Sequence, residues 1–203
     1  MTLPLALLRV GKMSLELIIG PMFAGKSTTV LQRIRRAKVL DTEVFIVTSA
    51  LDTRYDTGGS SLKTHDTEGV SAFGTNDLKS LLTLGGFTKA GLIVIEEAQF
   101  FTGLYDFVKL ILETYNKQVI VVGLDGDSDR RPFGEILQLI PLADTVTRLT
   151  ALCKRCGDGT PGLFTFHKGK TVQILIGGSG TYEALCRKHY LQLSQPIDPY
   201  WTP

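Results

Sequence analysis

The chain has little cysteine, little net charge and no long apolar run, and each shortage argues against a class of protein. Its 203 residues include only three cysteines, an odd and unevenly spaced set that disfavours a disulfide framework and is typical of a reducing compartment. The net charge of +2 predicts neither a nucleic-acid platform nor a polybasic membrane surface. No apolar run approaches the roughly 18 residues that a membrane-spanning helix needs. We therefore expect a cytoplasmic protein with no membrane or nucleic-acid partner.

The composition does supply material for a core. A chain of this length with 43% hydrophobic residues is expected to form one domain, or one domain with a small appendage. Residues 1–14 carry a short Leu-rich patch, but no basic residue precedes it and no small-residue cleavage site follows. These residues are therefore expected to be an N-terminal extension and not a secretory signal.

The stretch IIGPMFAGKS at Ile18–Ser27 matches the phosphate-binding pattern G-x-x-x-x-G-K-[ST] at every fixed position. An apolar run at Leu15–Ile19 precedes the pattern and a basic helical pattern at Thr28–Leu40 follows it, which is the strand–loop–helix setting of such loops. Backbone N–H groups and the helix N-terminus would bind a polyphosphate. Lys26 would reach its β- and γ-phosphates, and the Ser27 hydroxyl would ligate Mg²⁺. The alternative, a chance glycine turn before a helix, fits this context poorly.

Apolar runs alternate with helical patterns over residues 15–150. Strands are expected at Val44–Thr48, Leu92–Ile95 and Gln118–Val122, and helices at Asn76–Leu84, Leu104–Tyr115 and Phe133–Leu142. This alternation predicts an α/β domain whose mostly parallel central sheet is covered on both faces. The Asp-, Thr- and Gly-rich segment Ser49–Gly74 predicts a long functional loop with a weak hairpin around Leu62–His65 and Val70–Phe73.

Two glutamates follow the apolar strand LIVI directly. Glu96 occupies the position from which a carboxylate beside a phosphate loop holds Mg²⁺, directly or through water. Glu97 could then take a proton from an acceptor, or orient a water molecule if the enzyme is a hydrolase. The alternative is that both glutamates lie in a solvated turn.

The three cysteines and one histidine form two pairs of equal spacing, Cys153-x-x-Cys156 and Cys186-x-x-His189. Four soft ligands in two pairs suit tetrahedral Zn²⁺, and a closed set of four is typical of a structural site. The pattern predicts a small zinc-binding domain over residues 151–192, followed by a C-terminal tail at 193–203. The alternative is ordinary buried thiols with a histidine on a helix face.

Several segments taken in order resemble the zinc-containing type II thymidine kinases over about Leu15 to Tyr190. They are GPMFAGKST, DTRY, IEEAQFF, GLDGDSDRRPFG, LIGGSGTYEALC and the CxxC…CxxH pattern. The resemblance implies a RecA-like P-loop domain with a small zinc domain that carries a lasso loop. It implies transfer of the γ-phosphoryl group of ATP to the 5′-hydroxyl of thymidine, with Mg²⁺, in nucleotide salvage. It also implies a homotetramer and feedback inhibition by dTTP.

The resemblance also assigns roles to residues. Glu97 would be the catalytic base, with Glu96 and Ser27 on the magnesium side and Arg54 near the reacting phosphates. The ATP phosphates would be bound by Gly20, Pro21, Met22, Phe23, Ala24, Gly25, Lys26, Ser27 and Thr28. The nucleoside would be bound by Met22, Phe101, Leu124, Phe133, Gln173, Ile174, Leu175, Ile176, Gly177, Gly178 and Tyr182. Backbone groups among these would read the imide edge of thymine.

The chain departs from the family pattern at three positions. The metal-side acid is usually Asp and is here Glu96, which is one methylene longer and favours a water-mediated metal contact. Ser128 stands where the family commonly has an aromatic wall of the pocket, and His189 replaces the more frequent fourth cysteine. Two other functions fit the residues: a RecA-like zinc-ribbon ATPase stimulated by nucleic acid, and a nucleotide-binding regulatory protein without turnover.

Overall fold

The computed structural model of the chain describes residues 13–50, 61–62, 70–169 and 180–194. A six-stranded sheet lies at its centre in the order β5-β2-β6-β7-β1-β8, and every neighbouring pair is parallel. The strands are β1 (Ser14–Ile19), β2 (Val44–Ser49), β5 (Phe73–Thr75), β6 (Leu92–Glu96), β7 (Gln118–Gly123) and β8 (Thr145–Arg148). This sheet confirms the α/β class with a mostly parallel centre, the RecA-like P-loop arrangement that the resemblance implies.

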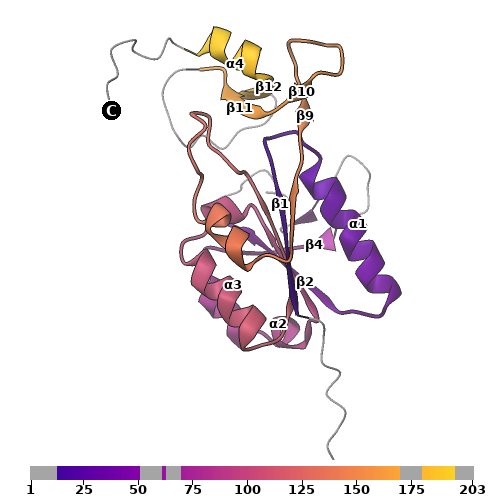
Figure 1. The fold of residues 1–203 in the computed structure, drawn as a ribbon. Coiled ribbons are helices and arrows are strands. Elements are labelled where there is room, and N and C mark those ends of the chain that lie inside the picture. The colour runs from indigo at the N-terminus through magenta and orange to yellow at the C-terminus, as the bar shows by residue number, and fades with distance from the viewer. Residues whose placement is uncertain (1–12, 51–60, 63–69, 170–179, 195–203) are drawn as a thin grey trace, which may run out of the picture.

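Helices cover both faces of the sheet, as Figure 1 shows. The helix α1 (Lys26–Val39) lies on one face, and α2 (Gly85–Lys89) and α3 (Leu104–Glu113) lie on the other. The described residues also contain the short 3₁₀ helices η2 (Leu78–Thr83), η3 (Ala98–Phe100) and η4 (Ile136–Leu142). No helix in the described part of the chain is both long and apolar enough to cross a bilayer.

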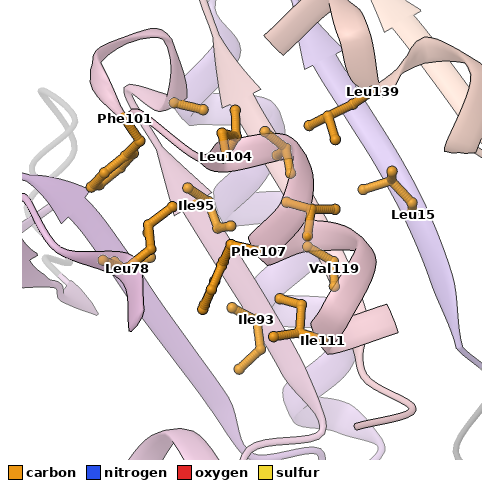
Figure 2. Packing of buried hydrophobic residues seen from close by; sticks show 14 of the residues in the cluster. Leu15, Leu78, Ile93, Ile95, Phe101, Leu104, Phe107, Ile111, Val119 and Leu139 are labelled. Carbon is orange, nitrogen blue, oxygen red and sulfur yellow. The ribbon is translucent and has the colours of Figure 1, made fainter. Parts of the chain in front are cut away.

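Side-chain alternation along the strands produces two cores. Ile93 and Ile95 of β6 join the larger cluster, which packs under α3 and is drawn in Figure 2. Leu92 and Val94 point to the opposite face and pack with Ile34 of α1. Because both faces are covered, every side chain of β6 is buried, and its sequence is apolar without alternation up to its last residue.

All six strands of the sheet end at one edge, because parallel strands share a direction. The phosphate-binding pattern follows β1, Glu97 follows β6 and residues 124–131 follow β7 at this edge. The C-terminal module, defined as residues 151–169 and 180–194, gathers beyond the same edge in Figure 1. It contains β9 (Ala151–Leu152), β10 (Pro161–Gly162), β11 (Phe164–His167), β12 (Tyr182–Leu185) and α4 (Arg187–Leu193).

The structure corrects several local expectations. The single helix expected at Asn76–Leu84 is instead the 3₁₀ helix η2, which ends at Thr83, and the separate helix α2 begins at Gly85. The helix expected at Phe133–Leu142 is the shorter 3₁₀ helix η4, with Pro141 inside it. The edge strands β5 and β8 have no counterpart in the sequence prediction. The expected hairpin is present as the two-residue pair β3 (Ser61–Leu62) and β4 (Val70–Ser71).

Candidate active site and metal centre

The phosphate loop turns sharply between β1 and α1. Gly20 has a φ of 146°, and a Cβ atom there would overlap with the backbone oxygen of Leu149. Gly25 has a φ of 75° and opens α1 in the left-handed conformation that favours glycine. The Lys26 ammonium donates to the carbonyl oxygens of Gly20 and Pro21 at 3.1 Å and 2.7 Å. Its side chain therefore already lies across the loop where a phosphate would bind.

The free backbone N–H groups at the starts of α1 and α3 differ in their hydrogen-bond acceptors. At α3 the Glu135 carboxylate accepts hydrogen bonds from the backbone N–H groups of Gly103 and Tyr105, at 2.8 Å and 3.1 Å. At α1 no side-chain hydrogen bond caps the helix, and a Cβ on Gly25 would meet nothing within 4 Å. Since the first N–H groups of a helix need an acceptor and carry its positive dipole end, the start of α1 fits an anionic phosphate.

The Glu96 side chain lies on the α1 face of the sheet. It continues the row of Leu92 and Val94, which pack toward α1, and only 5% of it is exposed. Its register neighbour on β2 is Thr48, whose hydroxyl is buried and has no hydrogen-bond partner among the described residues. A buried carboxylate beside such a hydroxyl, at the same edge as Ser27 of α1, fits a hydrated Mg²⁺.

Glu97 leaves the strand in a different direction from Glu96. Its φ of 50° and ψ of 41° are left-handed, a conformation that non-glycine residues seldom adopt and that often marks functional sites. Its carboxylate accepts a hydrogen bond from the side-chain nitrogen of Gln99 at 2.6 Å. The two neighbouring acids are therefore separated by the backbone, one toward α1 and one toward the loop after β7.

Residues 124–131, called here the β7 loop, are held by hydrogen bonds within the loop and to neighbouring segments. The Asp127 carboxylate accepts from the backbone N–H groups of Asp129 and Arg131, both at 2.9 Å. The Leu124 N–H donates to the side-chain oxygen of Gln99 at 3.0 Å, and Arg148 donates to Asp125 at 2.7 Å. Asp125 and Asp127 thus shape the loop.

The two neighbouring aromatic residues after β6 differ in burial. Phe101 is 2% exposed and belongs to the main core, where Figure 2 shows it at one end of the cluster. Phe100 is half-buried and packs edge-to-face on Phe133 with ring centroids 5.5 Å apart. Contact of Phe101, Leu124 and Phe133 with a nucleoside stays a prediction.

The C-terminal module contacts the site at two points that sequence reasoning missed. The Thr165 hydroxyl of β11 accepts a hydrogen bond from the Met22 N–H of the phosphate loop at 3.0 Å. The Tyr190 hydroxyl donates to the Ser128 carbonyl in the β7 loop at 2.5 Å, and Arg130 stacks over its ring at 4.4 Å. These partners are far apart along the chain, so no local pattern could have indicated them.

The four expected zinc ligands come together. The sulfur atoms of Cys153, Cys156 and Cys186 and the Nδ1 atom of His189 all lie within 4.8 Å of one another. Cys153, Cys156 and Cys186 sulfurs are 3.5 Å, 3.4 Å and 3.4 Å from Nδ1, and Cys156 is 3.9 Å from Cys186. A tetrahedral zinc ion with metal–sulfur bonds of about 2.3 Å has ligand–ligand edges of about 3.8 Å. The cluster therefore has the size of a closed tetrahedral metal centre.

The thiols of this cluster differ in acidity. Burial would raise the pKa of Cys153, but hydrogen bonds from the backbone N–H groups of Cys186, Cys156 and Arg155 outweigh it and lower that pKa to about 6. Burial, together with the neighbouring thiols, raises the pKa of Cys156 to about 11. One thiolate is thus favoured without a metal, and a cation has to displace the remaining protons.

Some expected site residues are placed and others are not described. Tyr182 is buried at the start of β12, with its ring against His167 at 5.0 Å. Phe23, Ala24, Ser27 and Thr28 lie in the phosphate loop or the first turn of α1. Arg54 and the segment Gln173, Ile174, Leu175, Ile176, Gly177 and Gly178, together with most of the expected lasso loop, fall outside the described residues.

Comparison with known proteins assigns this arrangement to a family. The sequence profile described as "Thymidine kinase" matches residues 13–190. The chain is 43% identical over 187 residues to thymidine kinase a of Arabidopsis thaliana, covering 90% of this chain and 77% of the relative. It is 38% identical to the thymidine kinase of raccoon poxvirus (87% and 96% covered) and 36% identical to the cytosolic thymidine kinase of Cricetulus griseus (91% and 77% covered). With a phosphate loop, an acidic strand end and a Cys₃His cluster in this order, the chain belongs to the thymidine kinase family.

Proposed function

We propose that this protein transfers the γ-phosphoryl group of ATP to the 5′-hydroxyl of thymidine, giving dTMP and ADP, in nucleotide salvage. The observation that carries the proposal is the shared edge of the sheet. There the uncapped start of α1, the buried Glu96 and the left-handed Glu97 follow the ends of β1 and β6. Family membership adds the substrate class, because the relatives are named for thymidine.

The chemistry follows from these positions. The N–H groups of residues 20–27 and the Lys26 ammonium would bind the ATP phosphates and stabilise the charge that builds up during transfer. Ser27 and Glu96 would hold Mg²⁺, which when bound neutralises the phosphate oxygens. Glu97 would accept the proton of the thymidine 5′-hydroxyl as that oxygen attacks the γ-phosphorus.

The rest of the site is proposed by extension. Arg54 would approach the reacting phosphates. Met22, Phe101, Leu124 and Phe133 would line the base pocket, while the backbone of 173–178 and Tyr182 would bind the thymine and deoxyribose. Cys153, Cys156, Cys186 and His189 would hold a structural Zn²⁺, supported by the fit of their spacing to a tetrahedron. We further propose a division into residues 15–150 and 151–192, a homotetramer, inhibition by dTTP, and a cytoplasmic location.

The first experiment measures ADP release by the purified protein with ATP and Mg²⁺, with and without a nucleoside. We expect release to depend on thymidine and to be much weaker with deoxycytidine. Hydrolysis of ATP without thymidine, stimulated by DNA, would instead indicate the nucleic-acid ATPase. Tight ATP binding without any turnover would indicate a regulatory protein.

The second experiment replaces the proposed base. Glu97→Gln should lower kcat about 10²- to 10⁴-fold, because the proton acceptor is lost, while the dissociation constant for ATP stays nearly unchanged. Glu113→Gln, at the far end of α3, is the matched control and should keep normal kcat. Normal turnover of Glu97→Gln would show that the base is misassigned.

A further inference from the structure

Gln99 is a buried polar side chain that the proposed chemistry does not use. It lies in η3, two residues after Glu97, and only 3% of it is exposed. Both ends of its amide are engaged, the nitrogen by the Glu97 carboxylate at 2.6 Å and the oxygen by the Leu124 N–H at 3.0 Å. Burying an amide at a position an apolar residue could fill is unfavourable unless its hydrogen bonds are made.

The orientation of this amide is fixed by its neighbours. A backbone N–H can only donate, so the Gln99 oxygen must face Leu124 and the Gln99 nitrogen must face Glu97. The nitrogen therefore donates to the carboxylate, which is a charge-assisted hydrogen bond and stronger than one between neutral groups. Glu97 is thus restrained at its side chain as well as at its left-handed backbone.

Gln99 fits in its position because two neighbouring residues are glycines without side chains. A Cβ on Gly123, at the end of β7, would overlap with the Gln99 side-chain oxygen. Gly134 has a φ of 61°, and a Cβ there would overlap with the Gln99 backbone oxygen. Gly123 therefore packs closely against the side-chain amide of Gln99, and Gly134 packs closely against its backbone.

We propose that Gln99 is the positioning residue of the catalytic base. It holds the Glu97 carboxylate toward the acceptor hydroxyl and ties it to the start of the β7 loop at Leu124. This inference rests on the proposed function, in which Glu97 is the base. Gln99 does not itself touch substrate. Its contribution is to keep the base in the reactive geometry, where misplacement by about 1 Å can cost about a hundredfold in rate.

The test compares two replacements of Gln99. Gln99→Met keeps the volume but removes both hydrogen bonds. Gln99→Glu keeps an acceptor for the Leu124 N–H but replaces the donor to Glu97 with a second carboxylate. We expect both variants to lower kcat about ten- to a hundredfold, with the KM for ATP unchanged. Normal kcat in Gln99→Glu would overturn the proposal, because only the contact to Leu124 would then matter.

A double-mutant cycle separates positioning from a general structural effect. If Gln99 acts through Glu97, Gln99→Met should change the residual kcat of Glu97→Gln by less than about twofold. A structural role would give the same loss in both backgrounds and would contradict the proposal. Gln32→Met, on the exposed face of α1, is the control for a Gln-to-Met change.

The cycle also separates this inference from the proposed function. If Glu97→Gln alone keeps normal turnover, the assignment of the base fails. If Glu97→Gln is inactive while Gln99→Met acts independently of it, only the positioning role fails. Equal thermal midpoints of Gln99→Glu and the unaltered protein show that the comparison is made between folded enzymes.

Discussion

The sheet domain and the C-terminal module reach a stable structure by different means. The sheet domain has a core on each face, and strands such as β6 and β7 are buried between them. In the described part of the module, the core cluster of buried residues consists of Cys153, Leu185 and Tyr190, with half-buried aromatics around it. Its strand pairings among the described residues, β9 with β10 and β11 with β12, are two and four residues long. So small an apolar core supplies little stability without a further constraint.

This difference indicates what the metal centre is for. The proposed structural zinc ion would supply free energy that the small apolar core of the module does not, and it would hold α4 against β11 and β12. The module then delivers two groups to the site, the Thr165 hydroxyl at the phosphate loop and the Tyr190 hydroxyl at the β7 loop. The sheet domain carries Glu96 and Glu97, the proposed metal-side acid and base, and the module contacts the loops beside them.

The largest expected effect comes from removing zinc. Zinc binding to such ligand sets contributes about 10–16 kcal/mol at neutral pH, so chelation or Cys186→Ser should unfold the module. We expect hydrogen exchange to show lost protection at β11, β12 and α4, while amides of β6 and β7 stay protected. Because the metal competes with protons for the thiols, and burial raises the pKa of Cys156 to about 11, zinc should be released more readily as the pH falls.

Zinc content, measured by atomic absorption on the same samples, is the accompanying control. Retained protection of β11 and β12 in zinc-free protein would show that the module's own packing suffices. That result would remove the distinction between the two regions.

An intermediate effect is expected from opening a cavity in each region. Ile93→Ala, in the main core, should lower the free energy of unfolding by about 2–5 kcal/mol in denaturant titrations. Leu185→Ala should weaken zinc affinity and lower the hydrogen-exchange protection of the module's amides. The denaturant midpoint for unfolding of the sheet domain should stay nearly unchanged. Leu110→Ala, on the exposed side of α3, is the control. Equal losses at Ile93 and Leu185 would mean that the two regions unfold as one unit.

The smallest effect tests the contact between the regions. Tyr190→Phe removes the hydrogen bond to the Ser128 carbonyl but keeps the ring against Arg130 and Phe166. We expect a loss of about 0.5–1.5 kcal/mol, seen as faster exchange of β7-loop amides and a modest rise in the KM for thymidine. Tyr115→Phe, on an exposed tyrosine, should change neither quantity. Unchanged hydrogen exchange of the β7-loop amides in Tyr190→Phe would show that the hydrogen bonds of Asp127 within the loop are enough to keep it in place.

Sequence patterns with a local cause predicted the structure well. The strand at Leu92–Ile95 is buried on both faces and reads as an unbroken apolar run, so its position was clear. The strand β8 is a short, mostly exposed edge strand with the sequence TVTR, so it contains no apolar run from which a strand could be predicted. The strand β5, at the end of the long Asp- and Gly-rich segment, was missed for a similar reason. Only three of its residues pair with β2, which is too few to show an alternation of apolar and polar side chains.

The site shows the same division. The pattern around Lys26 indicated phosphate binding, because loop, glycine and helix start are contiguous in sequence. The roles of Gln99 and Thr165 depend on partners that are distant along the chain, and no spacing rule reports such pairs. The different burial of Phe100 and Phe101 has a similar origin, since a short 3₁₀ helix decides which of two neighbouring rings turns inward.

The amino-acid sequence by itself determined the α/β class, the phosphate loop, the acidic strand end and the four members of the Cys₃His cluster. Each of these depends on backbone conformation or ligand spacing within a short segment. Only the tertiary structure decided that Glu96 and Glu97 face different partners, and that Thr165 and Tyr190 reach the loops of the sheet domain. Those outcomes depend on how separate segments pack, and packing is set by the whole core.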